Sequence, residues 1–117
     1  MKIEKFKVIE LTRNLILSIE KDLDNFPKKD IEIKRRIRKN SYDLLELEYE
    51  ANETKDIDYK KQLLYKIKAK IKVIDFLLNL SYDKKLINEK KYIKLGNIME
   101  DIIKYVSGWQ NRIPVIG

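Results

Sequence analysis

Apolar residues return every three or four positions along most of the chain, the spacing that places them on one face of an α-helix. The pattern occurs in four stretches, over residues of about 2–24, 30–53, 58–81 and 88–109. Each stretch would form a helix of roughly 30 Å, and short links favour antiparallel neighbours. The pattern therefore predicts an all-α, up-down-up-down antiparallel four-helix bundle, formed as a single domain over 1–117.

Four apolar stripes would supply the core of this bundle. In chain order they are Phe6, Ile9, Ile16, Ile19, Leu23 and Phe26; then Ile33, Ile37, Asn40, Leu44, Leu47 and Ala51; then Leu64, Ile67, Ile71, Ile74, Leu78 and Ser81; then Tyr92, Leu95, Met99, Ile102, Val106 and Trp109. Asp30 and Asn88 precede the second and fourth stretches, and we expect them to cap those helices. Asn40 either specifies register within the core or lies at its rim. Trp109 either closes the core or contacts another copy in an oligomer.

The residue types that are missing exclude most catalytic chemistry. The chain has no cysteine and no histidine, which excludes disulfides, thiol catalysis and zinc sites built from these residues. It also excludes the Glu-x-x-His motif of di-iron bundles and the usual base of a hydrolase triad. The three glycines are isolated, so no phosphate-binding glycine loop occurs. We expect a non-catalytic protein that needs no cofactor and no metal.

Charge interrupts every apolar stretch near the start of the chain, and the longest apolar runs hold only a few residues, such as 76–78. Neither a secretory signal nor a membrane span fits this pattern. We therefore expect a cytoplasmic protein that does not insert into a membrane.

The net charge of +7 is unevenly distributed. Residues 26–40 hold seven basic and two acidic side chains, whereas residues 41–58 hold one basic and seven acidic. In the predicted topology, residues 26–40 and about 82–94 meet at one end of the bundle, with twelve basic and four acidic side chains in total. We call this the basic end. The basic residues expected to contact an anionic partner lie there and on the third helix: Lys28, Lys29, Lys34, Arg35, Arg36, Arg38, Lys39, Lys66, Lys68, Lys70 and Lys72.

A solvated, lysine-rich face is the alternative interpretation of this charge. In a hairpin that turns near residue 55, Lys66 and Lys68 fall opposite Glu46 and Asp43 and can pair with them. Exposed pairs of this kind contribute roughly 0–1 kcal/mol each. Lys70 and Lys72 fall opposite Ser41 and Lys39, where no such partner is expected.

Further apolar residues lie beside the stripes, at Leu45, Tyr49, Leu63, Leu77 and Ile103. A single small bundle has limited room to bury all of them, and large exposed apolar patches usually mark interfaces. The sequence therefore predicts a closed homo-oligomer.

The order of several short motifs is distinctive. Phe26-Pro27-Lys28 ends the first helix, a basic run at 34–38 opens the second and Tyr49-Glu50-Ala51-Asn52 closes it. The third helix carries the Leu-rich run 74–81 and continues into 82–87, and the chain finishes near Ser107-Gly108-Trp109. This order resembles the accessory variability determinant proteins of diversity-generating retroelements. Their wider relatives are bacterial four-helix-bundle proteins that include those encoded in 23S ribosomal RNA intervening sequences.

The resemblance, which covers about residues 6–112, implies a homopentamer with a basic surface. It also implies a reverse transcriptase partner and binding of RNA or DNA in support of mutagenic retrohoming. The matching basic positions are Lys28, Lys34, Arg35, Arg36 and Arg38. Relatives often place arginines in the Leu-rich run of the third helix, where this chain has Asp75 and Asn79. The alternative hypothesis is a self-assembling structural bundle of the intervening-sequence type, without a dedicated role in nucleic-acid binding.

Overall fold

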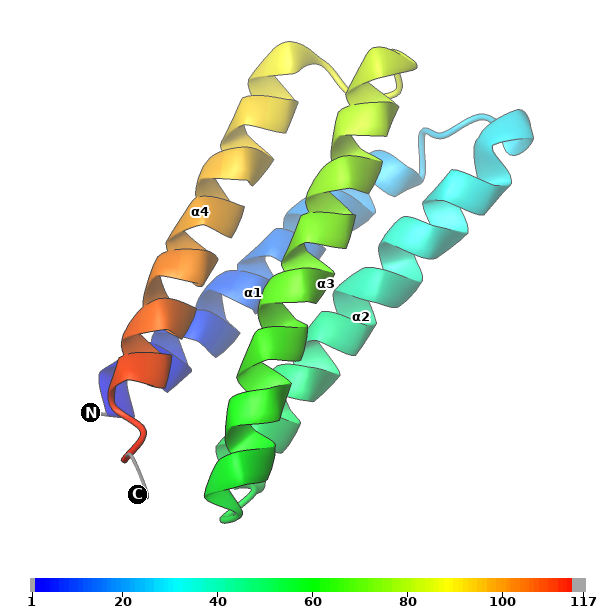
Figure 1. Ribbon diagram of the computed structural model, residues 1–117. Coiled ribbons are helices and arrows are strands. Elements are labelled where there is room, and N and C mark those ends of the chain that lie inside the picture. Colours follow the sequence, from blue (N-terminus) through cyan, green and yellow to red (C-terminus); the bar gives the residue numbers. More distant parts are fainter. Residues whose placement is uncertain (1, 115–117) are drawn as a thin grey trace.

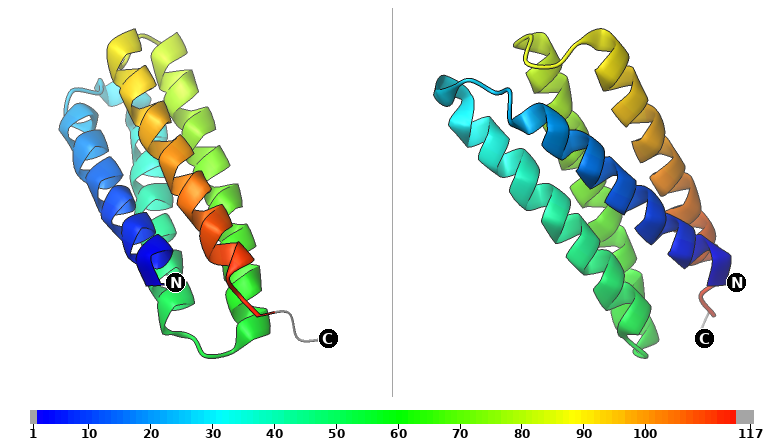
Figure 2. Two further views of the ribbon diagram at one scale, coloured as in Figure 1. Left: turned by 90° about the vertical axis from the view of Figure 1, so that its left-hand side faces the viewer. Right: turned by 180° about the vertical axis from the view of Figure 1, so that it is seen from behind.

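The computed structural model describes residues 2–114, which form four α-helices and one short 3₁₀ helix (Figure 1). They are α1 (Lys2–Leu23), η1 (Lys28–Asp30), α2 (Ile31–Glu53), α3 (Ile57–Asp83) and α4 (Glu89–Asn111). Each α-helix packs against the preceding and following helices, and α4 returns to α1 (Figure 2). The predicted up-down-up-down bundle is confirmed, with each helix boundary within two residues of the predicted one. The bundle measures 51 × 23 × 20 Å.

The stripes of α3 and α4 form the core as predicted. All six predicted residues of α3 are buried, and so are five of the six predicted residues of α4, Tyr92 being half-buried. Each fully buried Leu or Ile stabilises the fold by roughly 1.5–3 kcal/mol relative to its exposed state. Trp109 belongs to this core and is only 5% exposed, so the structure favours the core interpretation over an oligomer contact.

The predicted stripe of α1 was wrong at its start. Phe6 is 58% exposed, and the core is instead reached by Val8, Thr12 and Leu15. Thr12 is fully buried, so the periodic pattern passes through a polar residue. A similar displacement occurs on α2, where Ser41 and Glu48 are buried beside the predicted Asn40 and Leu47.

Asn40 lies at the rim of the core, the second of its two interpretations. Its side-chain amide donates to the Arg36 carbonyl oxygen at 2.8 Å, and its oxygen accepts from Lys70 of α3 at 3.2 Å. Of the five residues predicted to lie beside the stripes, Leu63 and Leu77 are buried within the bundle. Tyr49 is exposed, and Leu45 and Ile103 are half-buried, so the predicted apolar surface is found in part; a further exposed stretch is described below.

Candidate nucleic-acid interface

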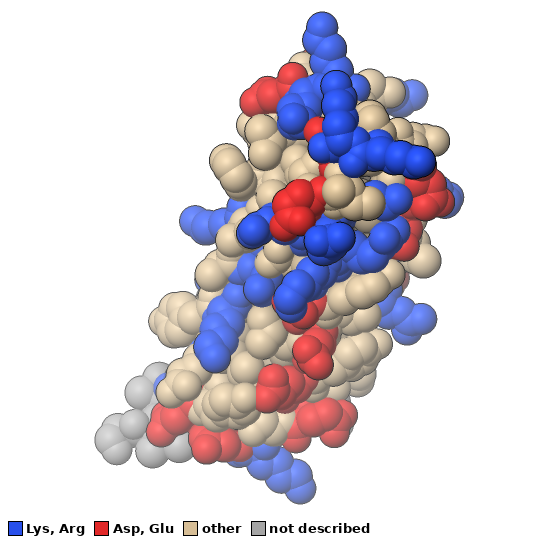
Figure 3. Space-filling model, turned by 90° about the vertical axis from the view of Figure 1, so that its right-hand side faces the viewer, with Lys and Arg blue, Asp and Glu red and all other residues tan. Residues whose placement is uncertain are grey.

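The basic end assembles as the topology predicts. The start of α2 and the end of α3 are joined by an ion pair between Lys84 Nζ and the Asp30 carboxylate at 3.2 Å. The end of α1 and the start of α4 are joined by Lys91, whose Nζ lies 3.3 Å from Asp22 and 2.9 Å from Ser18 Oγ. In the view onto α2, basic side chains gather in the upper part and acidic side chains in the lower part (Figure 3).

Two turns form this end, one after α1 and one after α3, and the two helices end in different ways. Pro27, in an extended conformation, separates α1 from η1, and the buried Phe26 anchors the turn to the core. At the end of α3 the chain turns through Lys85, whose φ of 63° is in the left-handed region that glycine usually occupies. The Leu86 N–H donates to the Ser81 carbonyl oxygen at 2.8 Å across this turn. Lys85 is thereby held exposed beside the other lysines of the basic end.

The capping prediction was correct for Asn88 and wrong for Asp30. Asn88 accepts a hydrogen bond from the Lys91 N–H at 2.8 Å and caps α4. Asp30 makes no side-chain cap to α2, because its carboxylate is 5% exposed and faces Lys84 instead. The cap of α3, which the sequence analysis did not identify, is Asp56, which accepts from the Tyr59 N–H at 3.1 Å.

Five of the eleven predicted contact residues already have partners within the chain. Arg35 and Arg36 share Glu32 at 3.3 and 3.1 Å, and Lys39 pairs with Asp43 at 2.9 Å. Arg38 reaches from α2 to Glu20 of α1 at 2.8 Å, and this hydrogen bond raises the pKa of Arg38. Lys70 is held by Asn40 and lies 3.8 Å from Asp43. Arg38 and Lys70 link neighbouring helices, whereas Arg35, Arg36 and Lys39 pair within α2, so all five have less charge free for a partner.

The side chains of the other six predicted residues have no hydrogen-bond or ion-pair partner within the described part of the chain. They are Lys28, Lys29, Lys34, Lys66, Lys68 and Lys72. Three further lysines of the basic end share this property and were not singled out from the sequence: Lys85, Lys90 and Lys94. The free positive charge of the basic end therefore rests on lysines that flank its two turns rather than on the arginines of α2.

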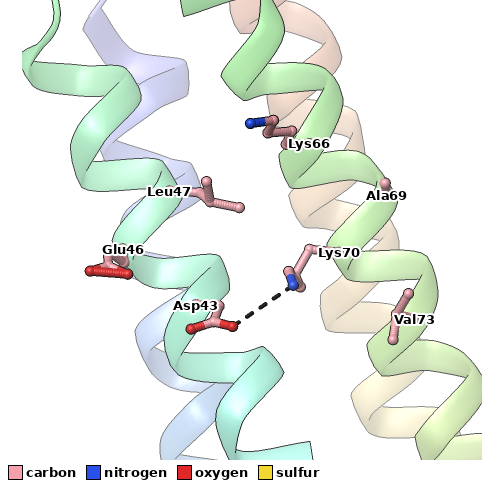
Figure 4. A pocket seen from close by; sticks show the side chains of 7 residues that line it. All are labelled: Asp43, Glu46, Leu47, Lys66, Ala69, Lys70 and Val73. Atoms are coloured by element: carbon pink, nitrogen blue, oxygen red, sulfur yellow. Dashed lines mark ion pairs between the residues drawn. The ribbon is translucent and has the colours of Figure 1, made fainter.

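The ion pairs predicted between α2 and α3 are replaced by a pairing that is shifted along the two helices. A groove of about 500 Å³ runs between the two helices, lined by Asp43, Glu46, Leu47, Lys66, Ala69, Lys70 and Val73 (Figure 4). Lys70, which was expected to have no acidic partner, is the residue that reaches Asp43. No ion pair between Lys66 and Glu46 or between Lys68 and Asp43 is formed among residues 4–114. This register leaves Lys66 and Lys68 available to solvent and to a partner.

A carboxyl group is buried where α1 and α2 meet. Glu48 is fully buried, and one of its oxygens accepts from Thr12 Oγ1 at 2.6 Å. Burial without a cation beside it raises the pKa of Glu48 to about 8, against a smaller opposing effect of the Thr12 hydrogen bond. The second Glu48 oxygen and the Asn52 side-chain oxygen, one turn further on, are buried without a donor in the described structure. This cluster lies in the core and offers no open site for a substrate.

Within the described residues, no group of three or more carboxylates is placed to hold a metal ion. No described helix is long and apolar enough to cross a membrane. Searches of protein-family models, curated proteins and solved structures found no match to this chain. The candidate interface is therefore defined by its own geometry: two lysine-flanked turns held side by side by the ion pairs of Asp30 and Asp22.

Proposed function

We propose that this chain is a non-catalytic accessory protein that binds RNA or DNA through the basic end. The single observation that carries the proposal is the set of lysines around the two turns, of which Lys28, Lys29 and Lys34 are the nearest to the start of α2. Their ammonium groups have no partner in the described structure, so contacts to phosphates would not require existing ion pairs to break. The positive end of the α2 dipole adds to the attraction.

Phosphate contacts position a nucleic acid without reading its sequence. Because the proposed contacts are to phosphates, we expect little sequence preference. By its resemblance to accessory variability determinant proteins, the chain would act together with a reverse transcriptase, as a homo-oligomer, in mutagenic retrohoming. The localisation consistent with this role is the cytoplasm.

The test is fluorescence anisotropy with a labelled oligonucleotide at several salt concentrations. Each neutralised phosphate contributes about 0.7–0.9 to the slope of log K against log salt. The triple variant Lys28→Ala, Lys29→Ala, Lys34→Ala should lower the affinity and reduce the slope by about two. The matched control is Lys55→Ala, Lys60→Ala, Lys104→Ala, which removes the same charge away from the basic end. If both variants lost affinity equally, net charge rather than the basic end would explain binding.

A second candidate function, the self-assembling structural bundle of the intervening-sequence type, is favoured by a different observation. The α2 arginines are engaged by Glu32 and Glu20, and apolar side chains are exposed along α3. If the wild-type chain bound neither RNA nor DNA at low salt, this candidate would replace the first.

A further inference from the structure

The outer face of α3 is apolar over four helical turns. Tyr65 is 69% exposed, Phe76 is 63% exposed, and Ala69, Val73 and Leu80 are exposed with them. The five residues follow one another at steps of four, four, three and four, so they form one continuous line of about 22 Å. We call this line the outer α3 stripe. Apolar stripes of this kind normally lie beneath another helix.

The rims of the outer α3 stripe are basic. Residues 65–80, which span the stripe, contain four lysines and one acidic residue, Asp75. Lys66 flanks the stripe on the side of α2, and Lys68 and Lys72 flank it on the side of α4, where Lys72 lines a second groove. None of the three has a partner within the described chain. Two copies that met through α3 alone would place lysines opposite lysines, which disfavours that symmetric arrangement.

A surface of opposite charge occurs on the second half of α2. Residues 42–53 contain five acidic residues and no basic residue. Tyr42 and Tyr49 are 48% and 43% exposed, with Leu45 half-buried between them. Glu46 and Glu53 are exposed, and neither has an ion-pair partner among the described residues. We call these five residues the outer α2 patch.

The stripe and the patch lie on different sides of the bundle. Tyr42, Leu45 and Tyr49 follow Arg38 at steps of four, three and four, and Arg38 reaches Glu20 of α1. Asp43, Glu46 and Leu47 line the groove against α3 (Figure 4). The apolar part of the patch, which is Tyr42, Leu45 and Tyr49, is therefore on the α1 side of α2, and Glu46 lies at its border with the groove. A contact between the patch of one copy and the stripe of another joins two different surfaces, which makes it head-to-tail.

We propose that the outer α3 stripe of one copy docks on the outer α2 patch of the next. The aromatic and aliphatic side chains of the two surfaces cover one another, and the lysines along α3 face Glu46 and Glu53. Each copy then offers one free stripe and one free patch, so the contact repeats into a closed ring or an open chain of copies. The proposal deepens the self-association in the proposed function and does not depend on nucleic-acid binding.

The first test measures mass by multi-angle light scattering and sedimentation velocity at micromolar concentration, on protein freed of nucleic acid. The wild type should exceed the 14.1 kDa of one chain several-fold. Phe76→Asp, in the stripe, and Tyr49→Asp, in the patch, should each be monomeric, because either change removes every contact of a head-to-tail assembly. Asn14→Asp adds the same charge at an exposed position of α1 and should leave the mass unchanged. A monomeric wild type, or an unchanged mass in either variant, would overturn the proposal.

Mixing the two variants tests the head-to-tail geometry directly. Phe76→Asp keeps an intact patch and Tyr49→Asp keeps an intact stripe, so an equimolar mixture should form a heterodimer of about twice the monomer mass. Two stripes meeting each other would instead leave Tyr49→Asp dimeric on its own and would add no mixed complex, and that result would overturn the proposal. Both altered side chains are exposed in the isolated chain, so circular dichroism should show that each monomeric variant keeps the wild-type helix content. If Phe76→Asp did not fold, Tyr65→Asp, which alters the other end of the same stripe, would serve as the second variant.

The oligonucleotide titration separates failure of this proposal from failure of the proposed function. If Phe76→Asp kept the wild-type mass and instead lost affinity for the oligonucleotide, the outer α3 stripe would be a nucleic-acid surface and the docking proposal would be overturned. Phe76→Asp could instead become monomeric and bind the oligonucleotide more weakly because avidity is lost. Mixing it with Tyr49→Asp, which restores a dimer, should then recover affinity, and that result would support both proposals.

Discussion

Two regions of this bundle reverse the usual distribution of polar and apolar side chains. Where α1 meets α2, the carboxyl group of Glu48 is buried with Thr12 and has no ion-pair partner among the residues that the structure describes. Along the outside of α3, Tyr65 and Phe76 are mostly exposed. The two departures have different consequences, because a buried polar group destabilises the isolated chain, whereas an exposed apolar stripe is neutral until a partner covers it.

The comparison separates properties of one chain from properties of an assembly. Changes at the Glu48 cluster should act on the free energy of unfolding and leave partners unaffected. Changes at the outer α3 stripe should act on mass and association and leave the folded monomer intact. Each prediction below tests one side of this comparison.

The largest expected effect is a pH dependence of stability that comes from Glu48. Its pKa is raised to about 8 in the folded chain, so the folded state retains a proton that the unfolded state releases above its ordinary pKa. The contribution is complete below about pH 4.5 and is lost as the pH rises to about 8, by about 5 kcal/mol. Urea unfolding across this range should show the loss in the wild type and not in Glu48→Gln. Parallel pH profiles for the two proteins would contradict the burial of this carboxyl group.

Adjacent residues of α3 provide a comparison of buried and exposed positions. Ile74 is fully buried and Val73 is 46% exposed. Ile74→Ala should lower the free energy of unfolding by about 2–5 kcal/mol, through lost contacts and a cavity. Val73→Ala should change it by less than about 0.5 kcal/mol. Both are measured in the Phe76→Asp background, so that association does not contribute; similar losses at the two positions would show that the outer stripe is part of the monomer core.

A smaller effect is expected from the hydrogen bond inside the cluster. Thr12→Val removes the only donor to Glu48 in the described structure and should destabilise the chain by about 1–3 kcal/mol. The double variant Thr12→Val, Glu48→Leu removes both polar partners and should recover that loss or exceed the wild type. A double-mutant cycle from urea unfolding gives the coupling energy. Additive single effects would mean that the two side chains do not interact.

The smallest expected effect is on the stability of the turn at Lys85, a residue that also belongs to the basic end. A side chain with φ of 63° costs about 1 kcal/mol, which glycine avoids. Lys85→Gly should therefore raise thermal stability slightly while it weakens oligonucleotide binding through lost charge. Lys85→Ala, which keeps the β-carbon, is the control and should weaken binding without the gain in stability. Equal stability of the two variants would remove the argument for backbone strain.

The sequence predicted the core best where apolar residues occupy nearly every core position, with Ser81 as the one polar member. The stripes of α3 and α4 fit a continuous heptad spacing and were placed correctly, from Leu64 to Ser81 and from Leu95 to Trp109. Eight of the twelve predicted residues of the α1 and α2 stripes are buried, and the buried Thr12 and Glu48 were missed because periodicity arguments assign polar residues to the surface. The hydrogen bond between them compensates part of the cost and is visible only in three dimensions.

The candidate site shows the same division. The meeting of residues 26–40 with 82–94 followed from the order and length of the helices, so the basic end could be predicted. The ion pairs that these basic residues form could not be predicted, because Arg38 pairs with Glu20, eighteen residues away, and Asp30 pairs with Lys84. These choices depend on the rotation and register of neighbouring helices, which a count of charges does not contain.

The central claim, that the basic end binds nucleic acid, is tested most directly by hydrogen–deuterium exchange with and without an oligonucleotide. The account predicts slower exchange in peptides that cover the turn at η1 and the turn between α3 and α4, around Lys28 and Lys85. Peptides around the α2–α3 turn near Lys55, where acidic residues dominate, should exchange at an unchanged rate. Protection confined to the α2–α3 turn, or no protection at saturating oligonucleotide, would contradict the claim.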